Sequence, residues 1–299
     1  MASNFFVNAD VILGAATVRQ VTATDHKTNA EIRKVMTSGG NAVSQVFAKM
    51  ASEVTTVTSN DLATLFALNT NTFCSAGLYL TSSTVTVPYK KRAAGGSFAS
   101  GSAHPALTGS TALVIPTLIE ATQEGDAASA QFEIHWLSSD GFTKGCDDAT
   151  GQALGSQAFG AEYTLGPVYI NSTLLTGVQS VRINPGIEVL KTMNGAGQVW
   201  PAFASIKNIV PTMEIGVNDF DSIAGTVGDI TAMTSANIYF RLRSDSGVYN
   251  AAGSNIVRFT FAAGIADTGS VTTSQNDNGS GTITLHGKTL TASVVQSIP

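Results

Sequence analysis

The chain has 299 residues, of which 43% are hydrophobic and only 12% are charged, and its formal net charge is −5. Globular proteins usually carry about 25% charged residues, so this composition is too apolar for a disordered chain and too poorly charged for an ordinary soluble monomer. We therefore expect surface to be buried in an assembly. An acidic chain whose one basic run is Lys90–Arg92 also lacks the phosphate-binding charge of nucleic-acid-binding proteins.

The sequence shows no targeting signal and no framework of cysteines. The start, MASNFFVNAD, has neither a basic region nor an apolar core of a secretory signal, and no run of about 18 apolar residues occurs. Cys74 and Cys146 are far apart and fit neither a disulfide framework nor a zinc motif. We expect a protein made in the reducing cytoplasm of its host.

A stretch near the start recurs in the second half. Phe6–Arg19 reads FVNADVILGAATVR, and Tyr169–Arg182 reads YINSTLLTGVQSVR, a displacement of 163 residues (169 − 6). Aligned this way, Gly14 matches Gly177, and we expect the two glycines to be equivalent turn or bulge positions.

Further matches follow in the same order, which predicts a tandem duplication. We expect a first β domain over residues 1–145, a linker or loop over 146–165 and a second β domain over 166–299. The remaining matched blocks are Glu31–Met36 with Glu188–Met193 (offset 157), Val54–Leu68 with Thr212–Ala224, Ser75–Leu80 with Ser235–Phe240 (offset 160), and Ala130–His135 with Gly281–His286 (offset 151).

The elements expected in each half are mostly strands. β-branched and aromatic residues dominate Thr84–Val87, Gln131–Trp136, Ile238–Arg243 and Ile256–Phe261, several with the alternation of a half-buried strand. One short helix is expected in each half. The predicted fold class is mainly β: two tandem β-sandwich or barrel domains of the same fold, each with one short α-helix.

The local signals for the helices and one turn are specific. In the first half Ser59 or Asn60 is expected to cap a helix with Asp61 in its first turn, and Leu62, Leu65, Phe66 and Leu68 form its apolar face. Asn276–Gly281 is expected to form a hairpin turn.

No motif of a catalytic, cofactor-binding or metal site is present, and we expect none of the three. His135 and His286 fall at matched strand positions, which duplication explains without a site. Asp147–Asp148 beside Cys146 is interpreted as a solvated linker, because no further ligands stand at useful spacing. The stretch around Asp277 resembles part of a calcium loop, but Lys288 stands where that loop has its twelfth-position Glu, so a turn is expected. The chain is not expected to be an enzyme.

The blocks Glu188–Ala204, Pro211–Ile215 and Asn218–Asp219 make the chain similar to the phage tail tube (major tail) protein family. Thr55–Thr56 with Asn60–Asp61 is the counterpart in the first copy, and Ile238–Arg243 with Ile256–Phe261 stands for the family's strand pair.

The resemblance implies a β-sandwich whose inner strands join those of neighbours, in six-domain rings stacked into a hollow tube that phage DNA crosses without specific binding. A two-domain chain then implies a homotrimer with pseudo-sixfold symmetry, although a hexamer remains open. The implied location is the virion tail, with no cofactor. The implied partners are further copies of the chain and the tape measure, terminator and baseplate proteins.

Two other functions remain open from the sequence. One is another virion component on the same domain, such as a neck, decoration or baseplate hub protein. The other is a tandem β-sandwich binding module, for which Trp136 and Trp200 are the only tryptophans available to stack on sugars. Residues 93–103 and 149–161 are expected to be contact arms between rings.

Overall fold

The computed structural model describes residues 5–36, 43–68, 72–92, 98, 101, 104–123, 126–154, 162–195, 197–227, 230–243, 252–274 and 277–299. Within them the chain is mainly β with three short helices, which confirms the predicted fold class. The first part contains β1 (Phe5–Asn8), β2 (Val11–Leu13), β3 (Ala16–Val18), β4 (Val21–Met36), β5 (Val43–Ser59), α1 (Leu62–Ala67), α2 (Phe73–Ala76), β6 (Leu78–Arg92), β7 (His104–Thr122), β8 (Ser129–Trp136) and β9 (Asp147–Gln152).

The second part has six strands before its one helix and three after it, and we refer to the two parts as the first copy (β1–β9) and the second copy (β10–β18). The second copy contains β10 (Tyr163–Ile170), β11 (Thr173–Leu175), β12 (Val178–Asn184), β13 (Ile187–Thr192), β14 (Phe203–Ile209), β15 (Thr212–Val217), α3 (Phe220–Thr226), β16 (Ile230–Leu242), β17 (Ala252–Ser274) and β18 (Asp277–Ser297).

The strand pairing is the same in both copies. The first copy runs in the order β4-β5-β8-β7-β6-β1, and the second in the order β12-β15-β18-β17-β16-β10, with every pair antiparallel. Irregularities recur as well: β7 skips one residue between Pro116 and Leu118, and β17 skips one between Thr268 and Ser270. The repeat is therefore one of strand pairing and of register.

Register corrects the alignment of the opening stretch. The β2–β3 hairpin closes at Leu13 and Ala16, and β10–β11 closes at Ile170 and Thr173. The equivalent residues are thus displaced by 157 (170 − 13), the same offset as at the matched glutamates, and not by 163. The matching of Phe6–Arg19 with Tyr169–Arg182 was wrong by six residues.

The two glycines are consequently not equivalent to each other. Gly14 corresponds to Asn171, and Gly177 corresponds to Gln20: Gln20 O accepts from Asn60 N as Gly177 O accepts from Asn218 N. All four residues have positive φ (65°, 49°, 71° and 50° respectively). Glycine is favoured at two successive turns of each copy, and the string match paired the glycine of one turn with that of the other.

The match of Ser75–Leu80 with Ser235–Phe240 was also wrong. In the first copy His135 lies opposite Leu113, which lies opposite Tyr79. In the second copy His286, the equivalent of His135, lies opposite Ile265, which lies opposite Ala232. Tyr79 therefore corresponds to Ala232 and not to Tyr239. The displacement there is 153 (232 − 79). α2, a second helix that the sequence did not predict, occupies the additional residues of the first copy.

The predicted helices are present, with a different cap. Asp61 and not Ser59 or Asn60 is the N-cap of α1, since its Oδ1 accepts from Thr64 N at 3.2 Å. Ser59 instead secures the preceding turn, donating to Arg19 O and accepting from Asp61 N. The helix buries Leu62, Leu65 and Phe66 against the strands. Asp219 caps α3 in the same way, through Ser222 N.

Three predicted loops differ from expectation or lie outside the described residues. The range 146–165 contains β9, which pairs with β7, and the start of β10. Asp277–Gly281 belongs to β18, because Ser274 already pairs with Asp277, and position 276 of the expected turn lies outside the described residues. The supposed arms at 93–103 and 149–161 fall outside the description at 93–97, 99–100, 102–103 and 155–161.

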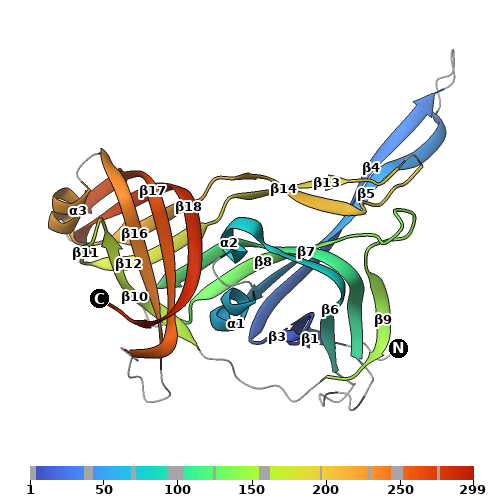
Figure 1. The fold of residues 1–299 in the computed structure, drawn as a ribbon, viewed down its shortest axis with the longest axis horizontal. Coiled ribbons are helices and arrows are strands. Elements are labelled where there is room, and N and C mark those ends of the chain that lie inside the picture. Colours follow the sequence, from blue (N-terminus) through green and yellow to red (C-terminus); the bar gives the residue numbers. More distant parts are fainter. Residues whose placement is uncertain are drawn as a thin grey trace.

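Two long hairpins extend from the copies (Figure 1). The hairpin of β4 and β5 projects from the first copy at one end of the molecule. Its counterpart in the second copy, β13–β14, does not project freely and instead crosses over the first copy toward β4 and β5. A continuous hydrophobic core spans both copies beneath the sheet faces.

Candidate assembly interface

The two copies are joined by strand pairing. Ile119–Thr122 of β7 pairs antiparallel with Ser180–Ile183 of β12, which merges both copies into one sixteen-stranded sheet. On one face Ile119, Ala121, Val181 and Ile183 are buried at 4% exposure or less. β-branched residues at alternate positions suit a sheet with one buried face, so the joint is packed like the interior of either copy.

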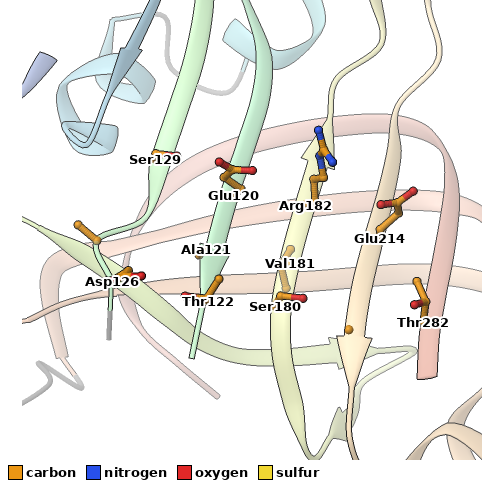
Figure 2. A pocket seen from close by; sticks show the side chains of 12 residues that line it. Glu120, Ala121, Thr122, Asp126, Ser129, Ser180, Val181, Arg182, Glu214 and Thr282 are labelled. Carbon is orange, nitrogen blue, oxygen red and sulfur yellow. The ribbon is translucent and has the colours of Figure 1, made fainter. Parts of the chain in front are cut away.

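The opposite face of this joint is polar. Glu120, Arg182 and Glu214 stand in a row across three neighbouring strands, because Arg182 is the cross-strand partner of both glutamates (Figure 2). They line an open pocket of about 510 Å³ that also contains Asp126 and Thr282. Its lining carries three carboxylates, one guanidinium, hydroxyls and backbone, with no nucleophile–base pair.

A second contact between the copies is made by the tip of the β13–β14 hairpin. Val199 N and Trp200 N both donate to Gly141 O, at 3.1 and 3.0 Å, and Ser138 N donates to Pro201 O at 2.9 Å. Ala51 N of β5 donates to Val199 O at 2.8 Å. The tip of the second copy's hairpin is thus bound to the backbone of the first copy.

Three titratable side chains, one from the hairpin and two from β8, interact at this contact. Burial lowers the pKa of Lys191 on β13 to about 8, although the Glu133 and Glu53 carboxylates oppose the shift. His135 Nε2 lies 3.1 Å from Glu133 Oε2, in an orientation that does not satisfy hydrogen-bond geometry. Burial lowers the pKa of His135, Glu133 acts against this, and Lys191 adds to it. The contact therefore encloses titratable groups from both copies.

The repeat places equivalent strand edges at the outer ends of the chain. By register, Ser180–Ile183 corresponds to Ala23–His26 of β4, and Ile119–Thr122 corresponds to Val271–Ser274 of β17. Ala23–His26 pairs with no strand except β5, and Val271–Ser274 with none except β18, in the part of the chain that the structure describes. Each end therefore presents half of the joint that β7 and β12 complete inside the chain.

The free hairpin exposes apolar side chains. Ile32, Val46 and Phe47 on β4 and β5 are exposed at 51%, 61% and 44%. Val46 and Phe47 are successive residues of β5 and so point to opposite faces of the hairpin, which means that these exposed side chains do not form one patch.

The histidines, aspartates and cysteine that were weighed as possible site residues lie in different environments. His135 is buried whereas His286, at the matched position, has a half-exposed side chain 3.6 Å from Asp267. Asp147 and Asp148 begin β9, and Lys144 is paired with Asp148. Cys146 does meet further potential ligands, His26 and Glu53, which sequence spacing did not reveal.

Comparison with known proteins assigns no family. No protein-family model matches the chain, and no curated protein matches it. Among the described residues, the three helices are all too short to cross a bilayer. The features that bear on function are the β7–β12 joint and the equivalent edges of β4 and β17, which pair with no further strand among the described residues.

Proposed function

We propose that this chain is a structural protein of a phage tail, in which copies join end to end into closed rings that stack as the hollow tube crossed by DNA. The observation that carries the proposal is the β7–β12 joint together with the equivalent, unpaired edges on β4 and β17. An exposed strand edge pairs readily with another chain, and this chain carries two complementary edges.

Joining those edges produces a heterologous interface. Such an interface places each chain in the same relation to the next, so it generates either a ring or an open filament. With the internal joint as template, β4 of one chain pairs with β17 of the next, with Asp25 opposite Thr272 and His26 opposite Val271. Three chains then supply the six domains of the pseudo-sixfold ring that the family resemblance implies.

The polar face of the joint supports a conduit. Side chains of Glu120, Asp126 and Glu214 outnumber Arg182 on the face opposite the core. If this face lines the ring, its carboxylates repel phosphate, so a DNA molecule passes without being held by counterion release. The chain's net charge of −5 has the same sign.

The positions of the two tryptophans do not favour the sugar-binding alternative. Trp136 is 1% exposed and donates its Nε1–H to Thr55 Oγ1 at 2.8 Å. Trp200 lies at the tip of the β13–β14 hairpin, bound to the first copy. The ring of Trp136 is therefore closed to a sugar, and Trp200 is only partly exposed.

The experiment is negative-stain electron microscopy of the purified full chain over a range of concentrations. Rings or stacked tubes with a central hole are expected, with threefold symmetry in end-on views. Val271→Lys places a charge on the proposed edge and is expected to leave folded monomers, since lysine protects strand edges from pairing. Val294→Lys is the control, because the exposed fraction of Val294 (40%) is similar to that of Val271 (43%). Val294 lies on β18 opposite Val257, away from the proposed edge. Wild-type monomers at high concentration, or tubes from Val271→Lys, would contradict the proposal.

A further inference from the structure

Three potential metal ligands from distant parts of the sequence meet at one end of the first copy. His26 comes from β4, Glu53 from the neighbouring strand β5, and Cys146 from the segment just before β9. One ligand atom from each lies within 4.8 Å of the others. Strand pairing brings the first two together, since His26 lies opposite Thr55, two residues from Glu53.

Glu53 is the most deeply placed charged group of the cluster. It is 5% exposed, and its Oε2 accepts hydrogen bonds from Gly145 N and Cys146 N, both at 3.1 Å. Lys144 and Lys191 lie within electrostatic range, but no ion pair among the described residues includes Glu53. A buried carboxylate normally requires a paired cation or a metal.

The imidazole of His26 is oriented by a hydrogen bond to Thr55. Its Nδ1 lies 2.9 Å from Thr55 Oγ1, and that hydroxyl also accepts the indole N–H of Trp136 at 2.8 Å. Metal-binding histidines are usually oriented by such an additional hydrogen bond on the ring. The chain Trp136–Thr55–His26 therefore provides a supporting shell on the inner side of the cluster.

The second copy provides an internal comparison. By register, Ile183 corresponds to His26, Pro211 to Glu53 and Met213 to Thr55, and Ile183 and Met213 are buried in the core. The fold thus forms with apolar residues at these positions. The polar residues His26, Glu53 and Thr55 of the first copy are therefore not needed for the sheet to form.

We propose that His26, Glu53 and Cys146 bind a transition-metal ion of the zinc type. Imidazole, carboxylate and thiolate are the ligands that zinc takes, and three protein ligands leave one position for water or another donor. Zinc lies about 2.0–2.3 Å from each ligand atom, so small side-chain rotations close the cluster around it. The ion ties the segment that follows β8 to the base of the β4–β5 hairpin.

Cobalt(II) titration of the reduced full chain tests the site. A cobalt–thiolate charge-transfer band is expected, and Cys146→Ala should abolish it while Cys74→Ala, at the other buried cysteine, should retain it. His26→Ala, on the half-buried hairpin base, is expected to weaken cobalt binding by at least about 10-fold.

The same titration decides against the proposal in two ways. No thiolate band in the wild type would show that Cys146 and Glu53 form only a hydrogen-bonded clamp. A band that persists in Cys146→Ala, or that disappears in Cys74→Ala, would place the metal elsewhere. A zinc-dependent rise in the melting temperature of the wild type, absent in folded His26→Ala, provides a second readout that does not depend on the spectrum.

Discussion

A disulfide between neighbouring chains tests the proposed joint directly. Inside the chain, Arg182 and Glu120 are cross-strand partners, and their equivalents at the open edges are Asp25 and Thr272. Antiparallel partners have Cα atoms about 4.5–5.5 Å apart, which lies within the range of about 4.4–6.8 Å that a disulfide spans. Asp25→Cys combined with Thr272→Cys should therefore crosslink one chain to the next without moving the backbone.

Mild oxidation followed by non-reducing gel electrophoresis is the assay. The double variant is expected to give dimers and then trimers as the largest species, because a closed ring of three chains has no free edge left. The two single variants should remain monomeric, since Cys74 and Cys146 are buried.

The matched control uses the internal joint. Arg182→Cys with Glu120→Cys is expected to form the bond within one chain, visible as a faster-migrating monomer. If this control oxidises while the Asp25–Thr272 pair stays reduced at concentrations that give tubes, the register carried over from β7–β12 is wrong. A ladder that continues beyond three chains would contradict the closed trimer and favour a filament.

Two further predictions concern the folded chain itself. Because burial lowers the pKa of Lys191 to about 8, the unfolded chain binds more protons than the folded chain between about pH 8 and about pH 10.5. The free energy of unfolding should therefore rise with pH across that window, by up to about 3 kcal/mol. The urea midpoint of Lys191→Met should lack this rise. Equal slopes in both proteins would refute the buried position of Lys191. Gly14→Ala should cost about 1 kcal/mol for its positive φ alone, since the nearest atom to an added Cβ is 3.6 Å away, whereas Gly177→Ala should cost more, because its Cβ would lie 2.5 Å from Asp219 Cβ. Equal unfolding free energies for the two variants would contradict that close approach.

The sequence predicted the class of fold because strand and helix signals are local. Alternation in Gln131–Trp136 and the apolar face of Leu62, Leu65 and Phe66 depend on neighbours within a few residues, and both are confirmed. Register is different, since it depends on which strands pair. Gly14 and Gly177 look alike because both turns need positive φ, and no local signal tells the first turn of a copy from the second.

The metal-ligand cluster was inaccessible for the same reason. His26, Glu53 and Cys146 are separated by 27 and 93 residues, and no spacing rule covers ligands so far apart. The pairing of β4 with β5 and the fold of the segment before β9 bring them together. The burial of Glu53 is the indication that the structure adds, because glutamate is rarely buried without a partner and the sequence does not show its burial.

The covalent link between the copies has a kinetic consequence for the proposed ring. In a ring of single-domain subunits every joint but the closing one forms by collision between separate molecules, whereas here every second joint, that of β7 with β12, is already made within a chain. Intramolecular joining replaces the concentration of free subunits by a high effective concentration. Ring nucleation therefore needs two encounters between chains where five would otherwise be required, since the last joint of either ring closes within the assembled oligomer. Assembly should begin at lower protein concentration than for an unlinked pair of the same domains.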